Sequence, residues 1–200
     1  MRRSMIWVGL AILLTVLAVT AYAVSRPYVF HGSTIQQPYA APDITLADGR
    51  GGQFHLADER GSLVFVFFGF THCPDVCPTT MAMMKQIHDR LGKDASRVQV
   101  VFVTVDPDRD TQDQANKYAT GFDPAFYGLS GSEAQLDPIW SAYGVYRKLD
   151  KSSPTDTNYD VEHSTQLYLI DENGNLRLTF PYGTPVDQVL QDVRYLLKQG

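Results

Sequence analysis

The sequence has little cysteine: only two of its 200 residues, Cys73 and Cys77, carry a thiol. A single bridge between residues four positions apart would constrain the unfolded chain little, because the entropic gain falls as the closed loop shortens. Stabilisation by a disulfide is therefore a poor explanation for the pair. In an oxidising compartment, two cysteines at this spacing either form a disulfide or bind a metal ion, so the pair indicates redox or metal chemistry.

The chain is also poor in basic residues, with 17 Lys and Arg against 22 Asp and Glu. The part that follows Arg26 holds 14 of the basic and all 22 of the acidic residues, which is a balance of −8. A negative domain repels a phosphate backbone, and no basic stripe offsets this repulsion. The composition therefore argues against nucleic-acid binding.

Charge is absent from the 19 residues Ile6–Val24, an apolar stretch preceded by Arg2 and Arg3. A helix needs about 20 apolar residues to cross a bilayer, whereas the apolar region of a signal peptide usually has about 7–15. We therefore expect residues 1–25 to be a retained membrane anchor; the alternative is a cleaved signal, because Ala21-Tyr22-Ala23 resembles a cleavage site. The positive charges before the stretch predict a cytoplasmic N-terminus. Because no Arg- and Ser-rich presequence precedes it, we expect a single pass through a bacterial inner membrane, with the soluble domain in the periplasm.

Residues 26–42 lack apolar periodicity and contain three prolines, which predicts a linker between the membrane and the domain. The remaining residues, 43–200, have the length of one globular domain, and they contain no internal repeat.

Apolar runs and turn signals divide residues 43–200 into strands and helices. Continuous apolar runs predict buried strands at 63–70 and 98–105, a shorter strand is expected at 126–129, and hairpins are expected at 44–56 and 165–180. Helices are predicted over 78–91, 111–120, 133–143 and 186–197. Strand–helix alternation demands parallel crossovers, and the last hairpin adds antiparallel strands, giving an α/β fold with a mixed sheet flanked by helices. This order resembles the thioredoxin-like fold, where a cysteine motif lies between a central strand and the next helix.

The two cysteines lie at such a junction, because Cys73 follows the strand 63–70 and Cys77 directly precedes Pro78. The N–H groups and dipole of a helix start favour negative charge, so we expect thiolates to form below the ordinary pKa of about 8.5. His163 ends the polar segment 151–163 and directly precedes a strand. In a thioredoxin-like sheet the loop entering that strand faces the cysteine motif. Two thiolates favour Cu(I), and an added imidazole also accepts Cu(II) or zinc.

Three segments resemble the Sco (SenC) family in their order and spacing. They are Phe70-Thr-His-Cys73-Pro-Asp-Val-Cys77-Pro-Thr, Thr104-Val-Asp106-Pro-Asp-Arg109-Asp110-Thr111 and Val161-Glu-His163-Ser, and the resemblance runs from about Ala41 to the C-terminus. It implies that Cys73, Cys77 and His163 bind a copper ion, as Cu(I), Cu(II) or both. It also implies a metallochaperone that assists assembly of the dinuclear copper centre of cytochrome c oxidase subunit II. In addition, it implies that Cys73 and Cys77 act as a redox pair that reduces the cysteines of that subunit.

The sequence leaves more than one role open for several other residues, and it leaves an alternative function open for the chain. Asp106 and Arg109 either support the metal site or contact the partner, or they form an ordinary strand-to-helix turn. Met81 and Met84 lie on the helical face of Cys77, and we interpret them as core. The main alternative function is a thiol–disulfide oxidoreductase without a metal role. Such enzymes of this fold typically carry CxxC and a cis-proline, whereas this chain has CxxxC and, at the corresponding place, His163.

Overall fold

The structure is a computed structural model that describes residues 2–24, 27–153 and 157–199. It comprises two compact units, Met1–Phe30 and His31–Gly200. The first unit contains helix α1 (Arg2–Val24), of which the side chains of 7–20 and 22 are described. Within the residues described, no helix is both long enough and apolar enough to span a membrane. The anchor over residues 1–25 therefore stays a prediction.

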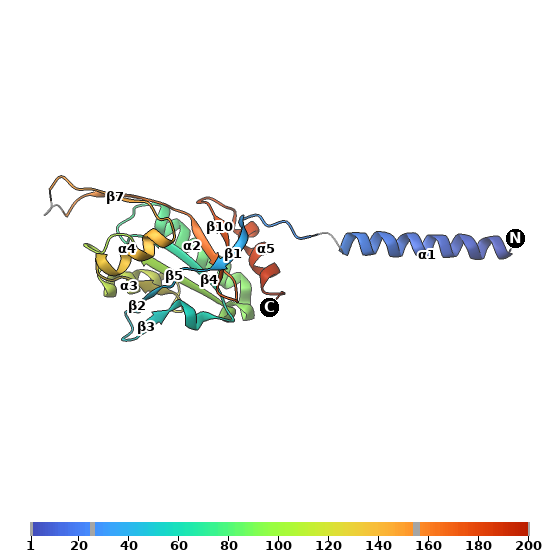
Figure 1. The fold of residues 1–200 in the computed structure, drawn as a ribbon, viewed down its shortest axis with the longest axis horizontal. Coiled ribbons are helices and arrows are strands. Elements are labelled where there is room, and N and C mark those ends of the chain that lie inside the picture. The colour runs from blue at the N-terminus through green and yellow to red at the C-terminus, as the bar shows by residue number, and fades with distance from the viewer. Residues whose placement is uncertain (1, 25–26, 154–156, 200) are drawn as a thin grey trace. The chain divides into compact units, whose positions relative to one another are not determined.

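The second unit is built on a six-stranded mixed sheet (Figure 1). Its strand order is β1 (Ser33–Ala40), β10 (Asn175–Phe180), β9 (Leu167–Ile170), β4 (Leu63–Gly69), β5 (Val98–Thr104) and β6 (Tyr127–Leu129). Strands β4, β5 and β6 are parallel, while β9 runs antiparallel to β4 and to β10, and β1 runs antiparallel to β10. Two small antiparallel pairs lie outside this sheet: β2 (Thr45–Ala47) with β3 (Gln53–His55), and β7 (Arg147–Asp150) with β8 (Asp160–His163).

Helices cover both faces of the sheet. Phe67 and Phe68 are successive residues of β4, so their side chains point to opposite faces. The ring of Phe67 lies 6.3 Å from that of Phe102, which in turn packs 5.0 Å from Tyr118 of α3 (Gln112–Phe122). On the other face, the ring of Phe68 lies 5.2 Å from that of Tyr143, the residue that follows α4 (Glu133–Ala142). The remaining helices are α2 (Val76–Leu91), α5 (Val186–Leu196) and the short 3-10 helices Leu56–Glu59 and Gly92–Arg97. The predicted α/β fold with a mixed sheet flanked by helices is confirmed.

The predicted linker extends too far toward the C-terminus. Residues 33–40 form β1, an edge strand paired with β10, so the compact unit begins at His31 rather than at residue 43. Seven of the eight side chains of β1 are exposed, which explains why the segment has no apolar alternation. Its Pro38 lies where the register shifts between Thr34 and Tyr39, and edges and bulges are the places where a strand tolerates proline.

Two further elements differ from the prediction near the cysteines and His163. Helix α2 begins at Val76, two residues earlier than expected, so Cys77 lies inside its first turn. Pro78 still costs no helical hydrogen bond there, because the first N–H groups of a helix have no partner within it. The segment 151–163, interpreted as polar, includes strand β8, whose side chains are exposed or only half-buried. Residues 154–156 of this segment lie outside the described residues.

Candidate metal centre

The loop between β4 and α2 brings the two cysteines together. The backbone N–H of Cys73 donates to the carbonyl oxygen of Phe70 at 3.3 Å, which folds the loop into a tight turn. The backbone N–H of Cys77 then donates to the Sγ atom of Cys73 at 3.4 Å. Both are free thiols; Cys73 is half-buried and Cys77 is fully buried. The pair is therefore adjacent in space, with Cys73 the more accessible of the two.

His163 ends β8 and points its ring at the buried cysteine. Its Nε2 atom lies 3.9 Å from the Sγ atom of Cys77. Its Nδ1 atom lies 2.7 Å from the carbonyl oxygen of Ser164, and since a carbonyl can only accept, Nδ1 carries the proton. Burial lowers the pKa of His163, although the bond to Ser164 opposes that shift. At neutral pH the Nε2 atom is thus unprotonated and directed at Cys77, whose thiol can donate to it. A fixed Nδ1–H is the usual support of a metal-binding histidine.

The environment of Cys77 overturns one expectation about its ionisation. Burial raises the pKa of the Cys77 thiol well above its ordinary value, and the neighbouring Cys73 and Asp110 raise it further; the backbone N–H of Phe70 only partly offsets these effects. The predicted lowering by the helix start is therefore wrong for Cys77. A metal ion that binds this sulfur must displace a proton.

Gly69, the last residue of β4, makes room for the Cys77 sulfur. A Cβ atom at this position would lie 3.0 Å from the Sγ atom of Cys77 and 2.9 Å from a ring carbon of Phe102. The sulfur therefore packs directly against the strand backbone. Sequence reasoning gave Gly69 no role, although an isolated glycine within a strand pattern is a known signal of such a close approach.

A buried carboxylate, Asp110, holds the cysteine loop in place. It accepts hydrogen bonds from the backbone N–H and the hydroxyl of Thr71, at 2.9 and 2.5 Å, and from the hydroxyl of Thr104 at 2.7 Å. Thr71 opens the turn that leads to Cys73, so these bonds tie the loop to the end of β5. Asp110 belongs to the second motif of the sequence, but nothing in its local pattern distinguishes it from its neighbours.

Asp106 and Arg109 lie one layer away from the thiols. Asp106 is fully buried and accepts hydrogen bonds from the Nε atom of Arg109 at 2.5 Å and from the hydroxyl of Tyr159 at 2.6 Å. The Arg109 guanidinium lies 5.8 Å from the centre of the Phe70 ring, which itself meets the His163 ring edge-on at 5.7 Å. These contacts favour the interpretation of the two residues as supports of the site, and the burial of Asp106 argues against a direct contact with a partner.

A surface cleft of about 330 Å³ gives access to the site. It is lined by Cys73 and His163 and by three carboxylates, Asp75, Asp160 and Glu162. Within the described part of the chain, no group of three or more His, Cys, Asp or Glu side chains is already arranged to hold a metal ion. The donor set itself fits a soft metal, because two sulfurs and an unprotonated imidazole nitrogen suit copper or zinc.

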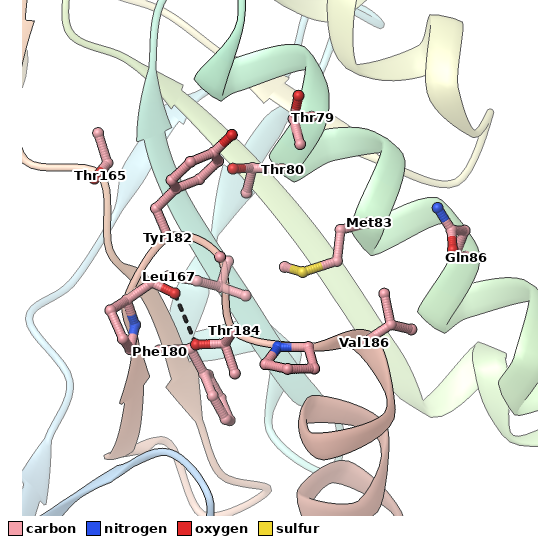
Figure 2. Close-up of a pocket in the computed structure, with 13 residues that line it drawn as sticks. Thr79, Thr80, Met83, Gln86, Thr165, Leu167, Phe180, Tyr182, Thr184 and Val186 are labelled. Atoms are coloured by element: carbon pink, nitrogen blue, oxygen red, sulfur yellow. Dashed lines mark hydrogen bonds between the residues drawn. The ribbon is translucent and has the colours of Figure 1, made fainter.

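A second pocket, of about 310 Å³, lies beside the site on α2 and shares Thr165 with the cleft (Figure 2). Met83 and Tyr182 reach into it from α2 and from the loop that follows β10 (Figure 2). Among the described residues, no cysteine, histidine or carboxylate lines it. Met81 and Met84 are fully buried, which confirms that they belong to the core.

Comparison with known proteins identifies the family of the chain. The family model for SCO1/SenC matches residues 32–198 of its sequence. The chain is 38% identical over 132 residues to a SCO2-like protein of Rickettsia felis, covering 66% of this chain and 64% of that protein. It is 35% identical over 154 residues to the mitochondrial SCO2 homolog of Homo sapiens, covering 76% of this chain and 58% of that protein. The chain thus spans about three fifths of the length of these two relatives.

Solved structures agree with the sequence comparison. The apo Sco1 protein of Thermus thermophilus superposes with a TM-score of 0.76 at 35% identity, covering 85% of this chain and 98% of that one. The ScoI protein of Bradyrhizobium japonicum, solved with copper bound, superposes with a TM-score of 0.71 at 32% identity, covering 80% of this chain and all of that one. The predicted thioredoxin-type α/β fold is confirmed by these similarities.

Proposed function

Because the chain belongs to the SCO1/SenC family, we propose that it binds copper and takes part in the assembly of cytochrome c oxidase. One observation carries the proposal: the unprotonated Nε2 atom of His163 lies 3.9 Å from the Sγ atom of Cys77, and the backbone N–H of Cys77 donates to the Sγ atom of Cys73. The copper-bound ScoI of Bradyrhizobium japonicum supports the choice of copper over zinc.

We propose Cys73, Cys77 and His163 as the three copper ligands. Their sulfur and nitrogen atoms suit Cu(I) and, through the imidazole, Cu(II). Three protein ligands leave the coordination sphere open for a ligand from a recipient protein, and Cys73 and His163 line the cleft from which that ligand would approach. The copper ion is the cargo in this scheme, and the proposed recipient is subunit II of cytochrome c oxidase.

The same cysteine pair supports a second role, the reduction of the subunit II cysteines. Cys73 is half-buried and lines the cleft, so its thiolate is the one that can attack an incoming disulfide. Cys77, adjacent to it, would then close the disulfide within this chain and release the reduced partner. A thiol–disulfide oxidoreductase without a metal role needs these two steps alone and makes no use of His163.

Copper stoichiometry of the reduced full chain separates these possibilities. We expect one copper ion per chain in the wild type, weakened but still measurable binding in His163→Ala, and loss of copper in the Cys73→Ser/Cys77→Ser double variant. His88→Ala is a matched control, because the His88 ring also packs edge-on against a phenylalanine, Phe126, at 5.4 Å. Copper retained without the three proposed ligands would contradict the proposal. Disulfide exchange with subunit II and no copper binding would favour the oxidoreductase.

We also propose that residues 1–25 anchor the chain in a bacterial inner membrane, with the domain in the periplasm. The uncharged stretch Ile6–Val24 and the preceding Arg2 and Arg3 support this location. Immunoblotting of the membrane fraction should detect a chain of undiminished mass. A shortened product in the soluble fraction would instead identify a cleaved signal.

A further inference from the structure

The two halves of the proposed copper site come from separate elements. The cysteines lie on the loop between β4 and α2, whereas His163 ends the β7–β8 hairpin, which is not part of the six-stranded sheet. The hairpin extends from the domain as a distinct arm (Figure 1). At the end of the hairpin that is nearer the domain, His163 of β8 is paired with Arg147 of β7. The distance between His163 and Cys77 therefore depends on what fastens this arm to the domain.

The fastening point is the segment 105–110, directly after β5. From β7, the Nε atom of Arg147 donates to the carbonyl oxygen of Val105 at 2.7 Å. On the other side, this segment also holds the cysteine loop, because the N–H of Val105 donates to the carbonyl oxygen of Gly69 at 2.7 Å and Asp110 binds Thr71. One short segment thus positions both halves of the site.

Tyr159, directly before β8, makes the most concentrated contact between the arm and this segment. Its hydroxyl donates to the buried carboxylate of Asp106 at 2.6 Å, and its carbonyl oxygen accepts from the Nη1 atom of Arg109 at 3.0 Å. Its ring lies 3.8 Å from the Arg109 guanidinium carbon and 4.6 Å from the Lys151 ammonium nitrogen. Lys151 in turn pairs with Asp108. The aromatic ring is therefore flanked by two cations, an arrangement that strengthens when it is desolvated, and Tyr159 is 7% exposed.

We propose that Tyr159 is a positioning residue: its hydroxyl bond to Asp106 fastens the β7–β8 hairpin to the segment 105–110 and thereby keeps His163 beside Cys77. The consequence for copper rests on the proposed function, whereas the consequence for the hairpin does not. The hydrogen bonds and cation contacts of Tyr159 described above involve none of the proposed ligands, so in this proposal it acts through His163. This role also explains why Asp106 and Arg109 lie one layer from the thiols and yet belong to the same constellation.

The test is Tyr159→Phe, which removes the hydroxyl and keeps the ring. Tyr143→Phe is the matched control, because Tyr143 is a buried tyrosine outside the hairpin whose hydroxyl donates to the carbonyl oxygen of Pro42 at 2.8 Å. The first readout is amide hydrogen exchange of the metal-free full chain. Hydrogen bonds to charged groups change equilibria by roughly tenfold to a hundredfold, so exchange at the β7–β8 amides should accelerate by at least about tenfold in Tyr159→Phe and not in the control. Unchanged hairpin protection would overturn the proposal.

The second readout is copper affinity, measured in the wild-type and His163→Ala backgrounds. A residue that acts through His163 weakens copper binding in the wild type and has no further effect once His163 is gone. If the two substitutions reduced affinity independently, or if Tyr159→Phe loosened the hairpin and left copper binding unchanged, the positioning role would be wrong. If the wild-type chain bound no copper, the proposed function would fail, and the exchange measurement would still decide the role of Tyr159 in the hairpin.

Discussion

A single methyl group at Gly69 is the most direct probe of the packing around Cys77. In Gly69→Ala the new Cβ atom would lie 3.0 Å from the Sγ atom of Cys77, 3.0 Å from a ring carbon of Phe67 and 2.9 Å from one of Phe102. All three neighbours are fully buried, so none can move into solvent. We expect the substitution to displace the sulfur and to disturb the central strand.

The size of the effect follows from the crowding. Extra carbon in a well-packed core typically costs about 1–3 kcal/mol, whereas Gly→Ala at a compatible position stabilises by about 0.4–1 kcal/mol. Gly121 in α3 is such a position, because no neighbouring atom lies within 4 Å of the place that an alanine methyl group would occupy there, and its helical backbone conformation is open to any residue. The two substitutions should therefore change the free energy of unfolding in opposite directions.

Urea unfolding of the reduced, metal-free chain measures this difference, and copper titration measures its effect on the site. We expect Gly69→Ala to lower both stability and copper affinity, and Gly121→Ala to leave affinity unchanged. A Gly69→Ala protein as stable as the wild type, with the same copper affinity, would refute the inference that the sulfur packs against the strand.

Three further predictions concern the charges of the site. Because the pKa of Cys77 is raised, copper binding should release its proton. Copper affinity, measured by competition with a chelator, should therefore rise by at least about tenfold per pH unit between about pH 6.5 and about pH 8; a flat profile would contradict this. For the same reason the unfolded chain loses that proton first, so the stability of the metal-free protein should fall above about pH 8.5, and Cys77→Ala should reduce the fall. Asp110→Asn should lower the free energy of unfolding, measured in urea, by about 1.5–3 kcal/mol, because it removes a charged acceptor from Thr71. Asp113→Asn is the control: Asp113 forms an exposed ion pair with Lys117, so its substitution should change that free energy by less than about 1 kcal/mol. Equal effects of the two substitutions would show that the Asp110 network does not hold the loop.

Much of the sheet could be predicted because its signals are local. The apolar runs that became β4 and β5 are buried on both faces, and such strands are recognisable from their own residues. Strands β1, β7 and β8 were missed because most of their side chains are exposed or half-buried. Their pairing depends on partners elsewhere in the chain, and no periodicity records it.

The site, too, could be predicted only where its signals are local in the sequence. The order of elements placed Cys73, Cys77 and His163 at one end of the sheet, and the structure brings them together. The ionisation of Cys77 was predicted in the wrong direction, because the helix start is visible in the sequence and the burial of the sulfur against Gly69 is a product of tertiary packing. Tyr159 could not be predicted at all, since its hydroxyl bonds a carboxylate 53 residues away.

The central claim is that copper is held by two sulfurs and one nitrogen of this chain. X-ray absorption at the copper edge of the loaded full chain tests it most directly. We expect one copper ion per chain with two sulfur donors and the nitrogen donor of an imidazole, and in His163→Ala the two sulfurs without that nitrogen. Copper that lacks sulfur donors, or that keeps the same donor set after Cys73→Ser/Cys77→Ser, would contradict the account.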